Sequence, residues 1–98
     1  MTTVHPSERV RIVTETARAV LEGRLSAEAG VQTLALQQQQ IEDRLRRDRI
    51  DVTQAEADTV ALTLRRLAEQ VGDKAPNSDP EASVAMARIL GELAQILR

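Results

Sequence analysis

The sequence predicts an all-α protein: a small four-helix bundle or a pair of packed helical hairpins, completed by dimerisation. Aliphatic residues recur at steps of three and four over four segments, which is the spacing of a helix buried on one side. Turn-forming residues separate these segments, and no segment alternates apolar and polar residues as a half-buried strand does. The 98 residues suit one domain spanning 1–98.

The first predicted helix spans about 6–22, because Pro6 suits a first helical turn and Gly23 a left-handed stop. Ser26 is a predicted cap for a second helix over about 26–49. The inward residues of the first helix are Val10, Val13, Ala17, Val20 and Leu21; those of the second are Ala27, Val31, Leu34, Ile41 and Leu45. Both rows indicate one buried side.

Thr53 and Glu56 have the spacing of a capping box, which predicts a third helix over about 54–71 that ends before Gly72. The stretch 72–79 is rich in turn residues and is the predicted linker. Asp79 then caps a fourth helix over about 80–97. Its inward row is Ala82, Met86, Ile89, Leu93 and Ile96, and that of the third helix is Ala57, Val60, Leu64, Leu67 and Val71.

The composition limits both stability and function. Phe, Tyr, Trp and Cys are absent, and the net charge is −2. Base stacking on aromatic rings, disulfides and thiolate metal sites are therefore excluded, and broad phosphate binding is disfavoured. A core of small aliphatic side chains buries little area per residue, so assembly into a dimer is the simplest way to bury more.

The most unusual stretch is LALQQQQIEDRLRRDRI, over 34–50. On a helix the four glutamines cannot share a face, and we expect Gln38 beside the inward row. There it either lies at the edge of the bundle or pairs across a helix interface and sets its register. The arginines are balanced by acids, and the predicted ion pairs are Glu42 with Arg46 and Asp43 with Arg47. The stretch is interpreted as a solvated helix face.

Motifs for chemistry are missing. His5 is the single histidine, and no residue stands at metal-ligand or triad spacing from it. No acid occurs in the Glu-x-x-His pattern of di-iron bundles. We therefore expect no enzyme activity, catalytic residue, metal or cofactor. LSAEAGVQTL, over 25–34, has the glycine of a helix-turn-helix, but the following helix lacks the basic surface that DNA reading needs.

The fourth helix carries a second apolar row, which predicts an interface. This row consists of Val84, Ala87, Gly91 and Ala94, again in alternating steps of three and four. Small residues let another helix approach closely, and glycine inside a helix costs about 1 kcal/mol relative to alanine. The row faces either a neighbouring helix of the same chain or a second copy, and we favour the second copy. Leu62 and Gln38 complete the predicted interface.

These observations favour a non-enzymatic protein–protein interaction or assembly module that acts through helix faces. The expected partners are a second copy of the chain and a further protein of unknown identity. A small dimeric regulator that binds nucleic acid is the alternative, and a ligand-binding bundle or enzyme subunit is a third reading. No apolar stretch approaches the length of a membrane span and no secretory signal is visible, so we expect a cytoplasmic protein without a membrane contact.

Overall fold

A computed structural model describes residues 7–74 and 79–97, and these form four helices and no strand. The helices are α1 (Glu8–Leu21), α2 (Ala27–Arg46), α3 (Gln54–Lys74) and α4 (Pro80–Ile96). This confirms the predicted all-α class and the four segments in their order. His5, Pro6 and the central part of the predicted linker, 75–78, lie outside the described residues.

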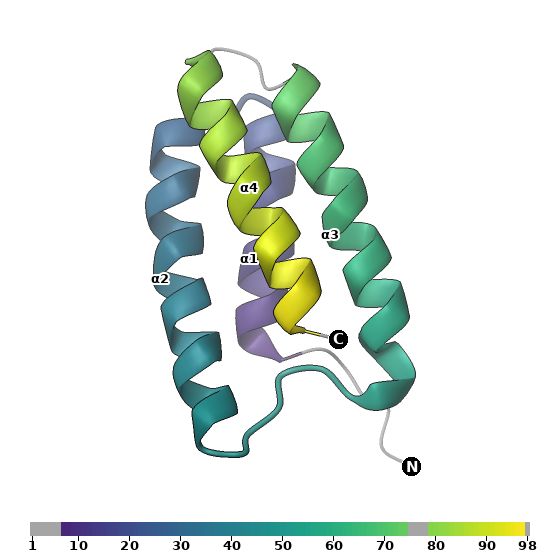
Figure 1. The fold of residues 1–98 in the computed structure, drawn as a ribbon. Helices are drawn as coiled ribbons and strands as arrows, with labels where there is room; N and C mark the ends of the chain where they lie inside the picture. The colour runs from purple at the N-terminus through teal and green to yellow at the C-terminus, as the bar shows by residue number, and fades with distance from the viewer. Residues whose placement is uncertain (1–6, 75–78, 98) are drawn as a thin grey trace.

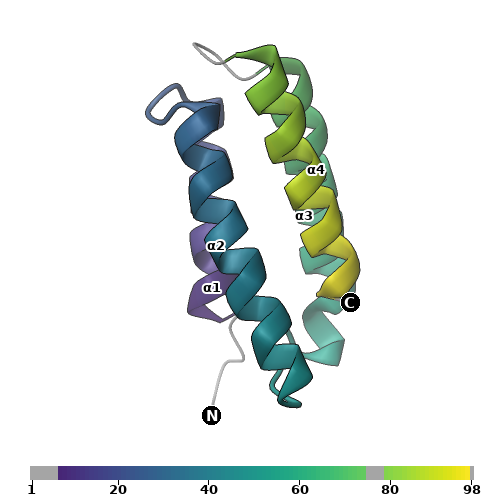
Figure 2. The same cartoon turned by 60° about the vertical axis from the view of Figure 1, so that its left-hand side comes forward.

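The four helices form two hairpins that pack face to face. α1 and α2 form one antiparallel hairpin and α3 and α4 the other, and Figure 2 shows them as two layers. Between the layers, α1 packs on α3 and α2 packs on α4, while α3 and α4 share the most extensive contact. The connection 47–53 crosses one end of the bundle, so the packed pairs α1/α3 and α2/α4 run parallel (Figure 1).

Side-chain caps fix several helix ends. The Ser26 hydroxyl accepts a hydrogen bond from the backbone N–H of Ala29 at 3.2 Å, as predicted. Ser7 caps α1 in the same way, accepting from Val10 N at 3.4 Å. Gly23 has φ 79°, which confirms the left-handed stop after α1. The serine caps therefore define where α1 and α2 begin, and the left-handed Gly23 defines where α1 ends.

Three helix ends differ from the prediction by two residues or more. α1 begins at Glu8 after its cap Ser7, two residues later than the start that Pro6 suggested. α2 stops at Arg46, three residues early, because Arg49 N donates back to the Arg44 carbonyl at 2.8 Å and Asp48 takes a left-handed φ of 58°. α3 continues past Gly72 to Lys74. Glycine lowers helix propensity but does not stop a helix that packs on a neighbour, and Gly72 lies beside Ala87 of α4.

The side-chain hydrogen bonds of the capping box that we predicted at the start of α3 are not formed. Glu56 N donates to the Thr53 carbonyl at 3.0 Å, so the helix begins where expected. However, Thr53 Oγ1 and Glu56 Oε2 are both buried without a hydrogen-bond partner in the described part of the chain. The reciprocal side-chain bonds that define the box are therefore not made.

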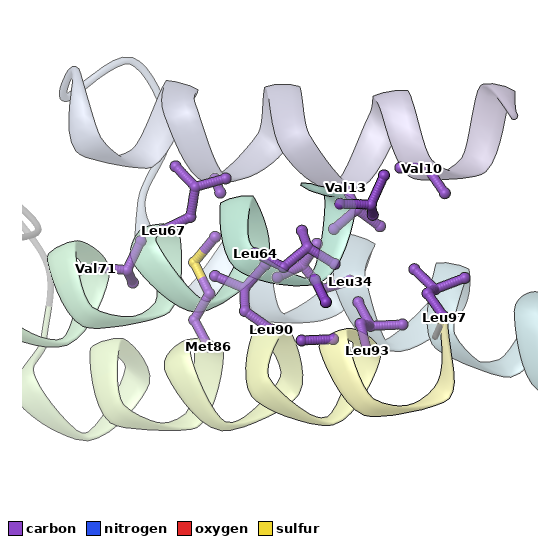
Figure 3. Packing of buried hydrophobic residues seen from close by; sticks show 14 of the residues in the cluster. Val10, Val13, Leu34, Leu64, Leu67, Val71, Met86, Leu90, Leu93 and Leu97 are labelled. Carbon is purple, nitrogen blue, oxygen red and sulfur yellow. The ribbon is translucent and has the colours of Figure 1, made fainter. Parts of the chain in front are cut away.

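The core is a continuous aliphatic cluster between the two layers (Figure 3). Its fully buried large side chains are Val13, Val20, Leu34, Ile41, Leu64, Val71, Met86, Leu90 and Leu93. Most of the predicted inward residues lie in this cluster, but the buried side of α4 differs from the prediction. Leu90, Ala94 and Leu97 are buried there, whereas the predicted Ala82, Ile89 and Ile96 are only partly buried.

On α2, Leu45 is an exception at 36% exposed, because α2 extends beyond the end of α4. The two helices run parallel, and Gly30 of α2 lies at the level of Met86 of α4. From this level Leu45 lies fifteen residues further along α2, whereas α4 ends after only ten residues, at Ile96.

Gly30 is the point of closest approach in the core. A Cβ added there would lie 2.9 Å from Met86 Sδ and 3.1 Å from Val20 Cγ2, and both of these side chains are fully buried. In the sequence, this glycine stood out only for its likeness to that of a helix-turn-helix. The structure shows that side chains of α1 and α4 both crowd α2 here, so that Met86 and Val20 would have to shift to admit a methyl group.

Gly30→Ala is expected to lower the free energy of unfolding by about 1 kcal/mol, because overpacking of about 1–3 kcal/mol outweighs the gain in helix propensity. Gly91→Ala is the matched control, since nothing lies within 4 Å of its added Cβ. It is expected to raise the free energy of unfolding by about 1 kcal/mol. Urea denaturation at low protein concentration measures both, and equal effects of the two substitutions would contradict the close packing at Gly30.

Candidate interaction surface

The structure divides the second apolar row of α4 between the protein interior and its surface. Ala94 is fully buried in the core. Ala87 is half-buried and faces α3, because its Cβ lies 3.7 Å from the Cβ position of Gly72. Val84 is 55% exposed and Gly91 half-buried. The chain's own core and α3 therefore already cover two of the four residues that we predicted to meet a second copy.

The outward side of α4 carries a row that consists of Val84, Arg88, Gly91 and Gln95, here called the α4 outer row. Steps of four, three and four place these residues on one side of the helix. No heavy atom lies within 4 Å of a Cβ built on Gly91. Packing inside the chain thus gives no reason for a glycine at this position, although it costs the helix about 1 kcal/mol relative to alanine.

Val84 lies in a shallow depression at one end of this row. Its lining is mostly apolar and comes from α4 alone: Pro80, Glu81, Val84, Ala85 and Arg88. Because a large aliphatic side chain stands exposed in a concave surface, this end of α4 offers an apolar contact to another molecule.

Two charged side chains flank Gly91 without partners of their own. Arg88 and Glu92 are exposed, and neither forms an ion pair with any residue that the structure describes. They stand four residues apart with the arginine first, which is the less favourable order for a pair within one helix. Both charges are therefore free to pair with another molecule.

Leu62 is 49% exposed on α3 but does not join the α4 outer row. α3 and α4 run antiparallel, and Gly72 of α3 lies at the level of Ala87 of α4. Leu62 lies ten residues from this level along α3, and Val84 lies three residues from it along α4, towards the opposite end of the bundle. The two residues are therefore about 20 Å apart along the bundle axis. The predicted interface residues thus occupy more than one surface.

The glutamine that enters the bundle is Gln37 and not Gln38. Gln37 is 7% exposed, whereas Gln38 is half-buried. The inward row of α2 runs through Leu34, Gln37 and Ile41, so the steps of three and four single out this residue. Its Oε1 atom is buried and has no hydrogen-bond partner among residues 7–74 and 79–97. It is an isolated polar atom in an apolar core, which costs stability.

A second exposed aliphatic group lies at the end of the bundle where α2 connects to α3. Ile50 is 65% exposed and lines a small pocket together with Leu45, Val52, Ile96 and Leu97. The sequence analysis did not identify this group, because Leu45 fits the inward row and Ile50 stands alone in a loop. The adjacent residue Asp51 also lines this pocket, although it is buried.

Asp51 anchors the α2–α3 connection. Its buried carboxylate accepts hydrogen bonds from Arg44 Nε at 3.1 and 3.2 Å and from Arg9 Nη1 at 3.4 Å. Its backbone carbonyl accepts from Ser7 N at 3.1 Å. Two arginines occupy the carboxylate, so its role is to hold the start of α1, the end of α2 and the loop together.

The surface arginines near the end of α2 share one acid. Arg47 pairs with Asp43 at 3.5 Å, as predicted. Arg46 also pairs with Asp43 at 3.5 Å, so its predicted pairing with Glu42 is wrong. A residue three positions away on a helix is as close as one four away, and Asp43 serves both arginines. On α1, a hydrogen bond to Glu8 raises the pKa of the Arg11 guanidinium, which keeps it charged.

No protein-family model, curated protein or solved structure matches the chain. Over 7–74 and 79–97, no helix combines the length and apolar character that a membrane span requires. Within the same residues, no three histidine, cysteine or acidic side chains gather in a way that would hold a metal ion.

Asp51→Ala is expected to lower the free energy of unfolding by about 2 kcal/mol, because it leaves Arg9 and Arg44 without their carboxylate. The loss stays below that of a fully buried pair since both arginine side chains are 32% exposed and screened by water. Asp43→Ala is the control, with an expected loss under about 0.5 kcal/mol. Thermal unfolding followed by circular dichroism tests this, and equal losses would refute the anchoring role.

Gln37→Leu is expected to raise the free energy of unfolding by about 1 kcal/mol, because it replaces an unpaired buried amide oxygen with an apolar side chain of similar size. Gln39→Leu, on the exposed side of α2, should change it by less than about 0.5 kcal/mol. Urea denaturation measures both. A clear loss of stability in Gln37→Leu would mean that the amide has a partner.

Proposed function

We propose that the chain is a non-enzymatic interaction module that binds through helix faces and forms a homodimer. The open space at Gly91 carries this proposal. A glycine that weakens its own helix, and whose added Cβ would meet no other part of the described bundle within 4 Å, is explained when another backbone or side chain packs against it. A second copy is the simplest occupant, since most soluble oligomers are built from identical chains around a two-fold axis.

The exposure of Val84 supports the same surface. Val84 lies two turns from Gly91 on the same side of α4, and the unpaired charges of Arg88 and Glu92 flank the glycine. An exposed aliphatic residue beside free charges of both signs is typical of an interface in which apolar contact gives affinity and charge selects the partner. The small aliphatic core also leaves the single chain with little stability to spare, which favours association.

The alternative of nucleic-acid binding has weaker support. Six arginines, at positions 9, 11, 24, 44, 46 and 47, pair with acidic side chains. The net charge is −2. Phosphate contacts need free basic side chains gathered on one face. The paired arginines therefore favour a solvated surface over a binding site for a nucleic-acid backbone.

Sedimentation velocity over a range of concentrations tests the proposal. The wild-type chain is expected to sediment as a dimer that dissociates on dilution. Val84→Asp should weaken association by about tenfold or more, because it introduces a charge into the apolar contact. Gly91→Leu should also separate the dimer while leaving helix content unchanged, since the bundle has space for the side chain.

Ile50→Asp is the matched control, because Ile50 is an equally exposed aliphatic residue at the end of the bundle. Its dimerisation constant should stay within about threefold of the wild type. A monomeric mass for the wild type at every concentration would refute the homodimer. Equal weakening by Val84→Asp and Ile50→Asp would remove the reason for placing the interface on α4.

A further inference from the structure

We infer that two copies of the chain meet along α4 in antiparallel orientation, with the two-fold axis beside Leu90 and Gly91. Arg88 of each copy then lies over Gly91 of the other and pairs with the partner's Glu92. This inference rests on the proposed homodimer and adds its orientation, its register and the residues that determine both.

The space at Gly91 sets the position of the axis. Because Gly91 has no side chain and no neighbour within 4 Å, a second helix can approach it more closely than any other point of the α4 outer row. The neighbouring positions of the row, Arg88 and Gln95, carry long side chains. Helix axes pack about 8–10 Å apart depending on the side chains between them, and the short end of this range needs a glycine or alanine at the contact.

Charge determines the orientation. Two parallel copies in register would place Arg88 against the partner's Arg88 and Glu92 against the partner's Glu92, so like charges would meet. In an antiparallel pair centred near residue 90, a residue of one copy lies opposite the residue of the other copy for which the two residue numbers add up to about 180. Arg88 then faces the partner's Glu92, and the two-fold axis generates this pair twice. Both side chains are exposed and form no ion pair with a described residue, so the pairing breaks none of the ion pairs seen in the bundle.

The steric and charge requirements are met together only in this register. The stem of Arg88 crosses the partner's Gly91 to reach the partner's Glu92, which fills the open space with the methylene groups of the arginine. Val84 then lies against the last turn of the partner's α4. An antiparallel pair centred on Val84 would also join opposite charges, Glu81 with the partner's Arg88. However, it would overlap only the first half of each α4, and Gly91 would lie outside the overlap of the two helices.

Charge reversal tests the pairing. Arg88→Glu gives a copy with two acids at these positions, and Glu92→Arg gives a copy with two bases. Each alone should weaken self-association by about tenfold or more, because like charges then face each other twice. Mixed in equal amounts, the two variants should form a heterodimer about as strong as the wild-type dimer, since both opposite-charge pairs are restored. The double variant, Arg88→Glu with Glu92→Arg, should self-associate again.

Glu15→Arg, an exposed acid on α1, is the matched control and should leave the dimer unchanged, whereas Glu81→Arg tests the register centred on Val84. Sedimentation velocity measures the association, and circular dichroism shows that each variant folds. A wild-type monomer would overturn both the homodimer and this inference. A wild-type dimer that neither reversal weakens would overturn this inference alone and place the interface elsewhere. Sensitivity to Glu81→Arg but not to Glu92→Arg would overturn it in favour of the register centred on Val84.

Discussion

The structure depends on close approach of helices in a core that has no aromatic side chain. Valine, leucine, isoleucine and methionine fill less space between helices than phenylalanine or tryptophan, so the backbones must come together to exclude water. Gly30 permits this approach where α1, α2 and α4 meet, with Met86 and Val20 in contact with its backbone. Gly72 and Ala87 lie in ordinary contact between α3 and α4. Gly30 thus marks the closest approach between the two layers that Figure 2 shows.

The same constraint distinguishes the surface from the interior. Gly30 lies so close to its neighbours that an added Cβ would crowd Met86 and Val20, whereas a Cβ on Gly72 would make an ordinary contact with Ala87 at 3.7 Å. Gly91 has no such neighbour, although it lies in the middle of α4 and lowers its propensity. A row of small residues in the sequence therefore has two different explanations in this fold. One part of the row lets α3 pack, and the outward part, flanked by Arg88 and Glu92, is open to another molecule.

The sequence was sufficient for the elements that depend on local signals. The four helices, the caps at Ser26 and Asp79 and the stop at Gly23 follow from the chemistry of a few neighbouring residues. It was not sufficient where the outcome depends on the packing of distant segments. The exposure of Leu45 follows from the end of α4, the burial of Ala94 from its place in the core cluster, and the burial of Asp51 from its contacts with the nearby Arg44 and the distant Arg9. The burial of Gln37 could have been predicted from the sequence, because Gln37 lies three residues after Leu34 and four before Ile41, on the inward side of α2.

Spin-label distances between two copies test the interface most directly, and the absence of native cysteine makes a single label straightforward. A nitroxide on Glu81→Cys lies nine residues from an axis at residue 90. The antiparallel dimer therefore predicts about 27 Å of axial separation between the two labels, and about 30 Å in all. Dilution with unlabelled chain should reduce the dipolar signal. A distance near 10–15 Å would mean a dimer centred on Val84, and no intermolecular signal at concentrations where the chain is folded would contradict the interface altogether.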